Sequence, residues 1–266
     1  MSDIRFHEMG AADNGNARRI AFRHTKGSGP TLVFLPGYMS DMSGSKATAL
    51  FDAAVAKGRG CLLLDYSGCG ASSGDFADGT LSRWRDEVLA VIEAQVSDPQ
   101  ESGKVLLVGS SMGGWLMLMV GTALGDQLAG IIGIAPAPDF TRWGFTEEQR
   151  ATMAAGETVY EDNPYGPEPT PTHPGFFADG EANLMLAKEM ERAIPIQCPV
   201  RLLHGQRDAD VPWETSLKLA RALDTDDVQV TLIKDGDHRL SRDQDIALLK
   251  AQTDSFYPNT FDQGVS

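Results

Sequence analysis

Short apolar runs recur along the chain and alternate with longer segments of helical periodicity. Runs rich in Leu, Val and Ile have the composition of buried parallel strands, whose two faces are both covered. We expect such strands at residues 31–35, 61–64, 104–108, 128–135, 200–203 and 228–233. Between and after them, helical patterns occupy residues 44–57, about 80–97 with Thr80 or Ser82 as the cap, the Met- and Leu-rich run after Gly113, 212–223 and 240–257. This order predicts an α/β fold with a mostly parallel sheet of about eight strands and helices on both faces.

Two regions depart from this alternation. Residues 4–8 and 17–24 surround the turn cluster at 13–16 and predict a partly exposed hairpin at a sheet edge. Residues 138–195 carry only local helical runs, at 146–155 and 181–193, and closely spaced prolines at 164, 167, 169, 171 and 174 exclude a long helix or a central strand there. We expect one α/β core at 1–137 and 196–266, interrupted by a small lid or cap insertion at 138–195.

Composition and charge exclude several kinds of partner. The formal net charge of −14 argues against nucleic acid, because a phosphate backbone requires Lys and Arg opposite it. Three cysteines are few and odd in number, which favours reduced thiols. No apolar run approaches the ~18 residues that a membrane span needs, and the first residues lack the apolar region of a signal peptide and the pattern of a transit peptide. We expect a cytoplasmic protein with no membrane span, and the oligomeric state stays open.

One turn carries the strongest chemical signal. The sequence Gly109-Ser110-Ser111-Met112-Gly113 is G-x-S-x-G between a buried strand and an apolar helical run, which is the context that this motif requires. Glycines without Cβ allow the tight strand-to-helix turn, and Ser111 is then presented above the sheet edge at a helix N-terminus. Ser111 is the candidate nucleophile.

A serine nucleophile needs a base and an acid, which follow it in the order Ser, Asp, His in this fold. The loop after 200–203 offers Asp208 and Asp210; we prefer Asp208, because Asp210 lies where a helix begins and suits a cap-region role. His238 is the only histidine on a loop after a late strand, whereas His204 ends a buried strand and is interpreted as structural. The oxyanion donors are expected to be the N–H groups of Met112 and Tyr38, since Pro36 has no N–H.

Two further patterns resemble functional motifs. Residues 70–74 also read G-x-S-x-G, with Ser72 at the centre, but no helix follows directly and we interpret them as a turn. Gly68 and Gly70 after a strand suggest a dinucleotide loop, but Ser73 stands where the third glycine belongs. We therefore expect no nucleotide, no metal and no cofactor.

The motifs at 34–46, 65–74, 109–118, 201–213 and 237–239 resemble those of α/β-hydrolases. More narrowly, they resemble the family of mitochondrial acyl-protein (palmitoyl-protein) thioesterases, also described as acyl-glucuronide esterases. The resemblance covers roughly residues 31–120 and 199–250, and little of the insertion. It implies an acyl-enzyme mechanism on thioesters or esters, S-palmitoyl cysteine among them, with Ser111, Asp208 and His238 as nucleophile, acid and base. We do not extend it to a mitochondrial location, because the N-terminus shows no clear targeting segment.

The leading hypothesis is a serine hydrolase of carboxylic thioesters or esters, acting on a small molecule or an acylated protein. A small-molecule carboxylesterase or lactonase with the same triad is the alternative among enzymes, and a non-catalytic binding protein of this fold is the alternative outside them. The insertion is rich in large apolar residues, which suit an acyl pocket. Phe140, Trp143 and Met185 are the expected substrate-binding residues, together with Met39 beside Tyr38.

Overall fold

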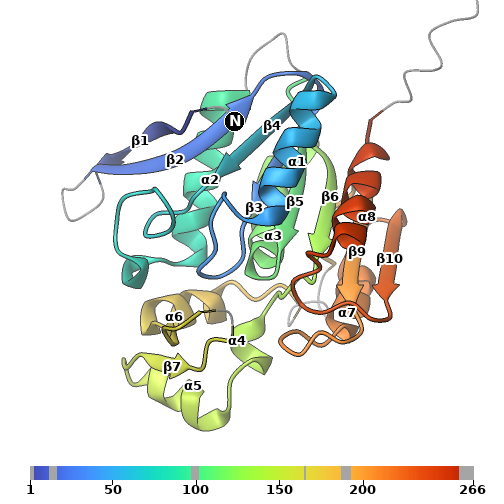
Figure 1. Ribbon diagram of the computed structural model, residues 1–266. Helices are drawn as coiled ribbons and strands as arrows, with labels where there is room; N and C mark the ends of the chain where they lie inside the picture. Colours follow the sequence, from blue (N-terminus) through green and yellow to red (C-terminus); the bar gives the residue numbers. More distant parts are fainter. Residues whose placement is uncertain (1–2, 12–16, 97–101, 165, 187–192, 258–266) are drawn as a thin grey trace, which may run out of the picture.

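The computed structural model describes residues 3–11, 17–96, 102–164, 166–186 and 193–257. Their centre is an eight-stranded sheet with the strand order β1-β2-β4-β3-β5-β6-β9-β10 (Figure 1). The strands are β1 (Arg5–Ala11), β2 (Ala17–Thr25), β3 (Ser28–Leu35), β4 (Arg59–Leu64), β5 (Val105–Ser110), β6 (Leu128–Ile134), β9 (Val200–Gly205) and β10 (Val228–Ile233). At one edge β1 pairs antiparallel with β2 and β2 pairs antiparallel with β4, and the strands β4, β3, β5, β6, β9 and β10 run parallel to one another. The predicted mostly parallel sheet and its edge hairpin are confirmed.

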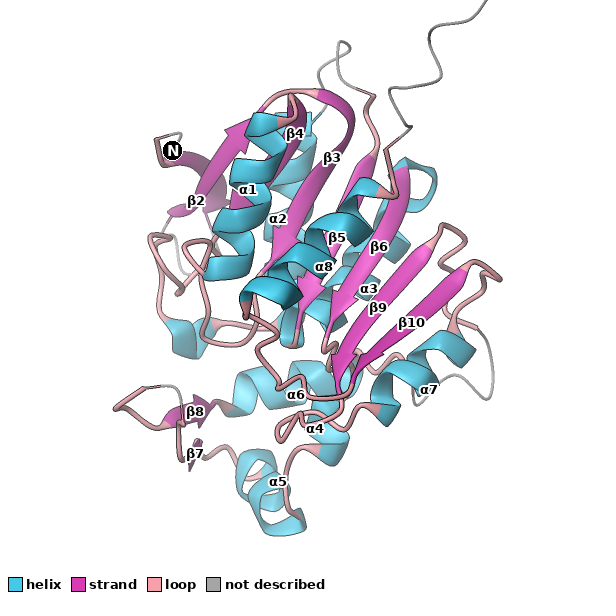
Figure 2. Ribbon diagram, turned by 45° about the vertical axis from the view of Figure 1, so that its right-hand side comes forward, coloured by secondary structure: helices cyan, strands magenta, loops and turns pink. Residues whose placement is uncertain are grey.

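Helices cover both faces of the sheet (Figure 2). One face carries α1 (Ser45–Ala56) and α8 (Asp243–Asp254), and the other carries α2 (Leu81–Val96), α3 (Met112–Leu124) and α7 (Glu214–Ala222). Two short 3₁₀ helices, η1 (Phe76–Asp78) and η2 (Gly125–Gln127), complete the connections. Thr80, one of the two expected caps, accepts a hydrogen bond from Arg83 N–H at 3.1 Å and begins α2.

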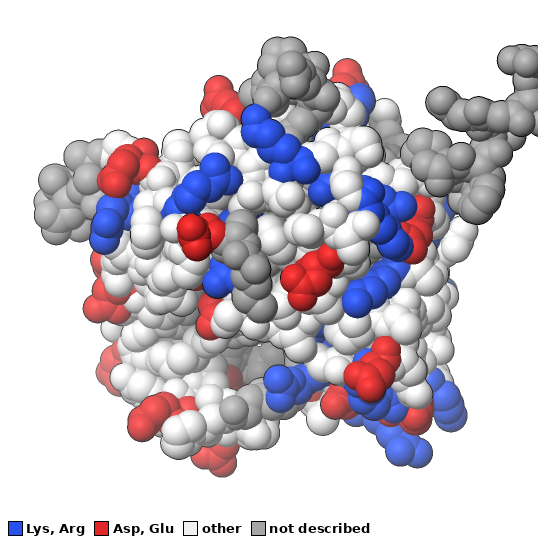
Figure 3. All heavy atoms as spheres, turned by 45° about the horizontal axis from the view of Figure 1, so that its top comes forward, with Lys and Arg blue, Asp and Glu red and all other residues white. Residues whose placement is uncertain are grey.

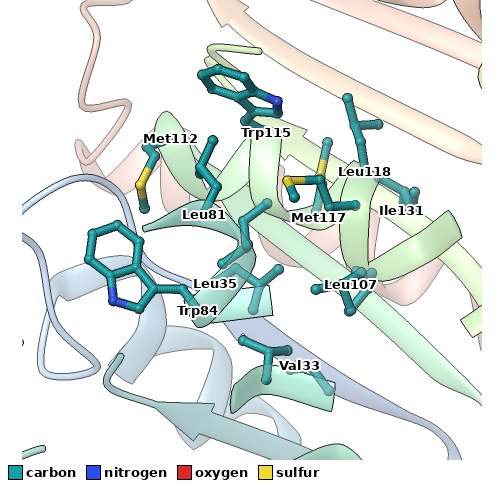
Figure 4. Packing of buried hydrophobic residues seen from close by; sticks show 14 of the residues in the cluster. Val33, Leu35, Leu81, Trp84, Leu107, Met112, Trp115, Met117, Leu118 and Ile131 are labelled. Carbon is teal, nitrogen blue, oxygen red and sulfur yellow. The ribbon is translucent and has the colours of Figure 1, made fainter. Parts of the chain in front are cut away.

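The core is two apolar layers separated by the sheet. Side chains alternate between faces of a strand, so Val105 and Leu107 of β5 join the layer beneath α2 and α3, while Leu106 and Val108 join the layer beneath α1 and α8. Figure 4 shows the first layer, in which Trp84 and Trp115 pack with Leu35 and Met112. Each fully buried Leu or Val contributes roughly 1.5–3 kcal/mol to stability. This packing fixes the strand ends that carry the candidate chemistry.

The segment between β6 and β9 lies outside the large sheet, beyond its carboxyl edge (Figures 1 and 2). It contains α4 (Phe140–Trp143), α5 (Glu147–Ala154), the two-stranded sheet of β7 (Val159–Glu161) and β8 (Thr170–Thr172), and α6 (Pro174–Ala182). The predicted run at 146–155 is confirmed as α5, which the side chain of Thr146 caps.

The expected helix at 181–193 is wrong over its described part. The helix there is α6, which begins at Pro174 and ends at Ala182, and residues 187–192 lie outside the described residues. A proline at the first helical position removes only an N–H that has no intrahelical acceptor. Pro174 therefore starts the short helix α6, whereas the prolines were expected to exclude a long one. Pro171 lies in β8, within a two-stranded sheet where proline is tolerated.

Candidate active site

Ser111 stands in a strained turn between β5 and α3. Its backbone has φ 55° and ψ −121°, a region that residues with a side chain rarely adopt. A Cβ on Gly109 would lie 2.3 Å from Gly113 O, and one on Gly113 would lie 2.1 Å from Leu35 O. Both glycines are therefore required for the chain to turn this sharply, as the motif predicts. Such strain persists only where the surrounding structure imposes it, and it clusters at functional sites.

Three sequence-predicted residues meet at this turn. Ser111 Oγ lies 3.1 Å from His238 Nε2, and His238 Nδ1 lies 2.9 Å from Asp208 Oδ2. Ser111 follows β5, whereas Asp208 follows β9 and His238 follows β10. Parallel strands bring their carboxyl ends to one edge, so residues 127 and 30 positions apart become neighbours. The arrangement can move a proton from a serine hydroxyl to an imidazole.

Asp208 is the carboxylate that contacts His238. Its side chain is completely buried, and its Oδ1 accepts from the N–H groups of Asp210 at 2.9 Å and Val211 at 2.8 Å. Burial alone would raise the pKa of Asp208, but hydrogen bonds from His204 and His238, the charge of His238 and the Val211 N–H outweigh it and hold that pKa well below its usual range. Asp208 is therefore ionised and oriented at neutral pH.

Asp210, the alternative acid, is exposed and donates its backbone N–H to Asp208. One ligand atom each of Asp208, Asp210 and His238 lie within 4.8 Å of one another, which is close enough to share a cation. Both Asp208 oxygens already accept hydrogen bonds, and a cation would displace them. The expected metal-free site stays a prediction.

Tyr38 and Met112 line the same cavity as Ser111. A Cβ on Gly37 would lie 3.3 Å from Ser110 O and 3.4 Å from Ser111 Cβ, so the backbone before Tyr38 runs against the turn. The loop is held by Asp65, whose Oδ1 accepts from Met42 N–H at 2.7 Å. The role of Tyr38 and Met112 as oxyanion donors stays a prediction.

The side chain of Tyr38 points toward the insertion. Its hydroxyl donates to Pro171 O at 2.9 Å, and its ring lies 4.9 Å from that of Phe176 and 5.0 Å from that of Phe76, centre to centre. One residue thus carries a candidate oxyanion N–H and also fastens the loop to β8 and α6.

A cavity of about 630 Å³ opens above Ser111 and His238. Of the predicted substrate-binding residues, Met39, Phe140 and Trp143 line it. Met185 does not: it packs against the core layer beneath α2 and α3, and its N–H donates to Asp139 Oδ1 at 2.7 Å. Asp139 also accepts from Leu186 N–H at 2.8 Å, so its carboxylate fixes the backbone of this segment of the insertion. The substrate-binding role of Met185 stays a prediction, because hydrophobicity alone does not say which layer a residue joins.

The sequence did not single out the polar wall of the cavity. Lys46, in the first turn of α1, donates to Arg239 O at 2.5 Å and to Ser241 Oγ at 3.4 Å. Burial, followed by the charge of Arg239, lowers the pKa of Lys46 to about 8. Lys46 therefore ties α1 to the loop that carries His238. Only its position within the 34–46 motif could have indicated it.

The two misleading motifs have structural explanations. Ser72 Oγ accepts from Ala21 N–H at 2.8 Å and donates to Asp65 O at 2.7 Å, so it joins the loop to β2. A Cβ on Gly70 would lie 2.2 Å from Asp65 Oδ2, which explains that glycine without a nucleotide. Across the face in Figure 3, basic and acidic side chains are intermixed. The expectation that nucleic acid is not a partner stays a prediction.

Comparison with known proteins identifies relatives over most of the chain. The sequence profile of the Alpha/beta hydrolase family matches residues 32–254. The mitochondrial palmitoyl-protein thioesterase ABHD10 of Homo sapiens is 35% identical over 239 residues, which cover 86% of this chain and 74% of the relative. That of Mus musculus is 38% identical over 235 residues, covering 86% and 76%.

Solved structures with the same fold also match nearly the whole chain. A hydrolase of Agrobacterium vitis S4 superposes with a TM-score of 0.86 at 39% identity, over 96% of this chain and 100% of that one. Mouse alpha/beta hydrolase domain-containing protein 10 gives 0.83 at 33% identity, over 96% and 98%. A soluble variant of monoglyceride lipase from Saccharomyces cerevisiae shares the fold, with a TM-score of 0.72 at 15% identity over 97% and 96%.

These relatives correct one expectation. They bear mitochondrial names, so the predicted cytoplasmic location is wrong. The N-terminal pattern was a weak basis for that prediction, because transit peptides are recognised from composition alone. None of the helices within the described ranges is both long and apolar enough to cross a bilayer. The predicted fold and the predicted class of hydrolase are confirmed: this chain belongs to the α/β-hydrolase family.

Proposed function

We propose that this protein is a serine hydrolase that cleaves carboxylic thioesters or esters through an acyl-enzyme, with S-acylated cysteine of a protein as the leading substrate class. The observation that carries the proposal is the continuous hydrogen-bonded series Ser111–His238–Asp208 at the floor of a cavity large enough for an acyl chain. The names of the relatives support the thioester, since they are called palmitoyl-protein thioesterases.

Acylation begins when Ser111 Oγ attacks the carbonyl carbon and His238 Nε2 takes the hydroxyl proton. Asp208 keeps the imidazole oriented with Nδ1–H toward the carboxylate and stabilises the imidazolium. The N–H groups of Tyr38 and Met112 stabilise the negative oxygen of the tetrahedral intermediate, with a contribution of the α3 N-terminus. The carbon–sulfur or carbon–oxygen bond of the leaving group breaks as His238 returns the proton to it.

Deacylation repeats these steps with water. His238 removes a proton from a water molecule that attacks the acyl carbonyl, and Ser111 leaves with that proton restored. The acid then dissociates.

We further propose that residues 138–195 act as a lid over this site. The feature that supports this role is the apolar wall that Phe140, Trp143 and Phe145 contribute to the cavity, whereas β7 and β8 contribute polar residues to its lining. An acyl chain loses contact with water when it lies against such a wall, and each buried CH₂ contributes about 0.8 kcal/mol. The insertion would then set the preferred acyl length, whereas the sheet edge performs the reaction.

An active-site fluorophosphonate tests the proposal directly. The expected result is stoichiometric labelling of Ser111 in folded protein, with no labelling of Ser111→Ala and unchanged labelling of Ser72→Ala. Unlabelled folded protein would overturn the proposal in favour of a non-catalytic binding protein. A series of p-nitrophenyl esters and acyl thioesters of increasing chain length then separates a thioesterase from a short-chain carboxylesterase or lactonase.

A further inference from the structure

A second histidine contacts the Asp208 carboxylate. His204 is the fifth residue of β9, and its side chain is completely buried. The chain turns back directly after the strand, with Asp208 N–H donating to Gly205 O at 3.3 Å. This turn brings His204 Nε2 to 3.1 Å from Asp208 Oδ2, the oxygen that also lies 2.9 Å from His238 Nδ1. Two imidazoles therefore share one carboxylate oxygen.

The partners of His204 define where its hydrogen lies. Its Nε2 faces two acceptors, Asp208 Oδ2 and Val211 O, both at 3.1 Å. Neither an ionised carboxylate nor a carbonyl can donate, so Nε2 carries a hydrogen. Its Nδ1 lies 2.7 Å from Ser216 Oγ, in the first turn of α7. Ser216 therefore holds the imidazole ring from the side opposite to Asp208.

This assignment completes the surroundings of Asp208. Its Oδ1 accepts from two backbone N–H groups of the β9–α7 loop, and its Oδ2 accepts from His238 and His204. The carboxylate therefore has four donors and little freedom to rotate. The only donor among them that belongs neither to the loop backbone nor to the predicted triad is His204.

We propose that His204 is a positioning residue for the reaction: from Nε2 it fixes the Asp208 carboxylate against His238, and Ser216 fixes His204. The inference rests on the proposed serine hydrolase function. His204 is not a catalytic residue, because it is absent from the residues that line the cavity and lies behind Asp208. Its effect reaches the substrate only through Asp208 and His238.

Loss of this donor has two expected consequences. The carboxylate gains freedom, so His238 is held less well against Ser111, and a misplacement of about 1 Å can cost roughly 10²-fold in rate. The carboxylate also keeps more of its negative charge for His238, which favours the protonated imidazole. Besides the Asp208 carboxylate, the charged or titratable groups near His238 are Asp210 from the β9–α7 loop, Asp237 and Arg239 on either side of it in the chain, and Lys46 from α1, which donates to Arg239 O.

The test uses His204→Phe, which removes the donor and keeps most of the ring volume, and His204→Gln, whose amide N–H can reach the same carboxylate. Hydrolysis of a p-nitrophenyl ester is followed from pH 5 to 9, with active sites counted from the burst of p-nitrophenol. For His204→Phe we expect kcat per active site to fall roughly 10- to 100-fold with KM nearly unchanged. We also expect the acid limb of its kcat/KM profile to move to higher pH, and His204→Gln to recover much of both changes.

Two further variants keep the inference falsifiable if His204→Phe does not fold. Ser216→Ala keeps the His204 donor to Asp208 but removes the hydroxyl that holds the His204 ring. It should therefore lower kcat and shift the acid limb in the same direction as His204→Phe, by a smaller amount. Thr215→Val, at the neighbouring buried hydroxyl of α7, is the matched control and should behave like the unaltered protein.

The inference is overturned if His204→Phe keeps the original kcat and acid limb. It is equally overturned if the Phe and Gln variants lose activity alike with an unmoved acid limb, since a purely structural role lowers activity at every pH. Failure of the proposed function looks different, because the unaltered protein itself would then show no burst and no dependence on Ser111.

Discussion

Two regions of the molecule meet at the cavity, and they are held in different ways. At the sheet edge, close contact of backbone with backbone fixes the turn that carries Ser111, because Gly109 and Gly113 leave no space for a Cβ. In the insertion, side chains fix the positions, as where Asp139 holds the chain at Met185 and Leu186. Backbone constraints survive most side-chain replacements, whereas side-chain packing changes with each of them. We therefore expect the reaction to depend on the sheet edge, and substrate preference to depend on the insertion.

The largest effects should come from the sheet edge. Ser111→Ala and His238→Ala should each lower kcat by roughly 10⁴- to 10⁶-fold, and the double variant should be hardly worse, because the two residues act as one unit. Steady-state hydrolysis of a p-nitrophenyl ester measures this. Ser72→Ala is the control, and a comparable loss in that variant would show that the wrong serine was chosen.

Asp208→Asn should cost on the order of 10⁴-fold in kcat, because an amide at this position leaves the His238 imidazole in the wrong tautomer. Asp210→Asn should cost far less, since its contact with Asp208 runs through its backbone N–H, which the substitution keeps. The same ester assay compares the two variants. A larger loss in Asp210→Asn would transfer the role of the acid to Asp210.

The same difference explains how far the sequence could predict the structure. The strand at 104–108, the turn at 109–113 and the loops holding Asp208 and His238 follow from apolar runs, glycine and chain order, which are local signals. His204 was correctly expected to be buried with its polar atoms satisfied. Its contact with Asp208 was missed, because only the turn after β9 brings the two side chains together.

Most elements and side-chain positions of the insertion could not be predicted from the sequence, for a physical reason. Its elements are short, and their periodicity is too brief to show which face is apolar; β7 and β8 have three residues each. The same residue type also occurs in two different structures there, since Pro174 begins the helix α6 and Pro171 lies in the strand β8. Met185 and Phe140 are both large and apolar and both pack against the core layer beneath α2 and α3, yet only Phe140 also lines the cavity. Tertiary contacts decide such cases.

Acidic pH should lower the stability of the protein through His24 in β2, independently of the sheet edge and of the insertion. Burial, followed by the charges of Arg5 and Lys26, lowers the pKa of His24 to about 4 from 6.5. As pH falls from 6.5 to 4, the unfolded chain binds a proton that the folded chain does not, so stability falls by up to about 3 kcal/mol. Thermal unfolding across this window should show a shallower decline in Tm for His24→Gln. An unchanged decline would contradict the assignment.

Substitutions in the cavity wall should change the preferred acyl-chain length more than the reactivity of Ser111. Phe140→Ala and Trp143→Ala each remove apolar wall, and kcat/KM for long-chain thioesters should fall roughly 10-fold relative to short-chain ones. Fluorophosphonate labelling of Ser111 should stay intact. Met185→Ala is the matched comparison: it should lower Tm and leave the chain-length profile unaltered, because Met185 packs in the core. A profile unmoved by all three variants would make the insertion structural and move the acyl pocket toward Tyr38 and Met39.

The smallest expected effect lies where the two regions join. Tyr38→Phe removes only the hydroxyl that donates to Pro171 O, and keeps the ring against Phe76 and Phe176. A neutral hydrogen bond of this kind contributes about 1 kcal/mol. The substitution keeps the backbone N–H of residue 38, which is the candidate oxyanion donor. We therefore expect kcat to fall only a few-fold, while proteolysis within β7–β8 becomes faster.

The control for this join is Tyr160→Phe, since Tyr160 lies in β7 with 64% of its surface exposed. It should change neither proteolysis nor kcat. If Tyr38→Phe instead speeds proteolysis and leaves kcat untouched, the insertion moves without disturbing the oxyanion loop, and the two regions are mechanically independent. If kcat falls without faster proteolysis, the hydroxyl acts on the loop alone. Either result would sharpen the division between a sheet edge that performs the reaction and an insertion that selects the acyl group.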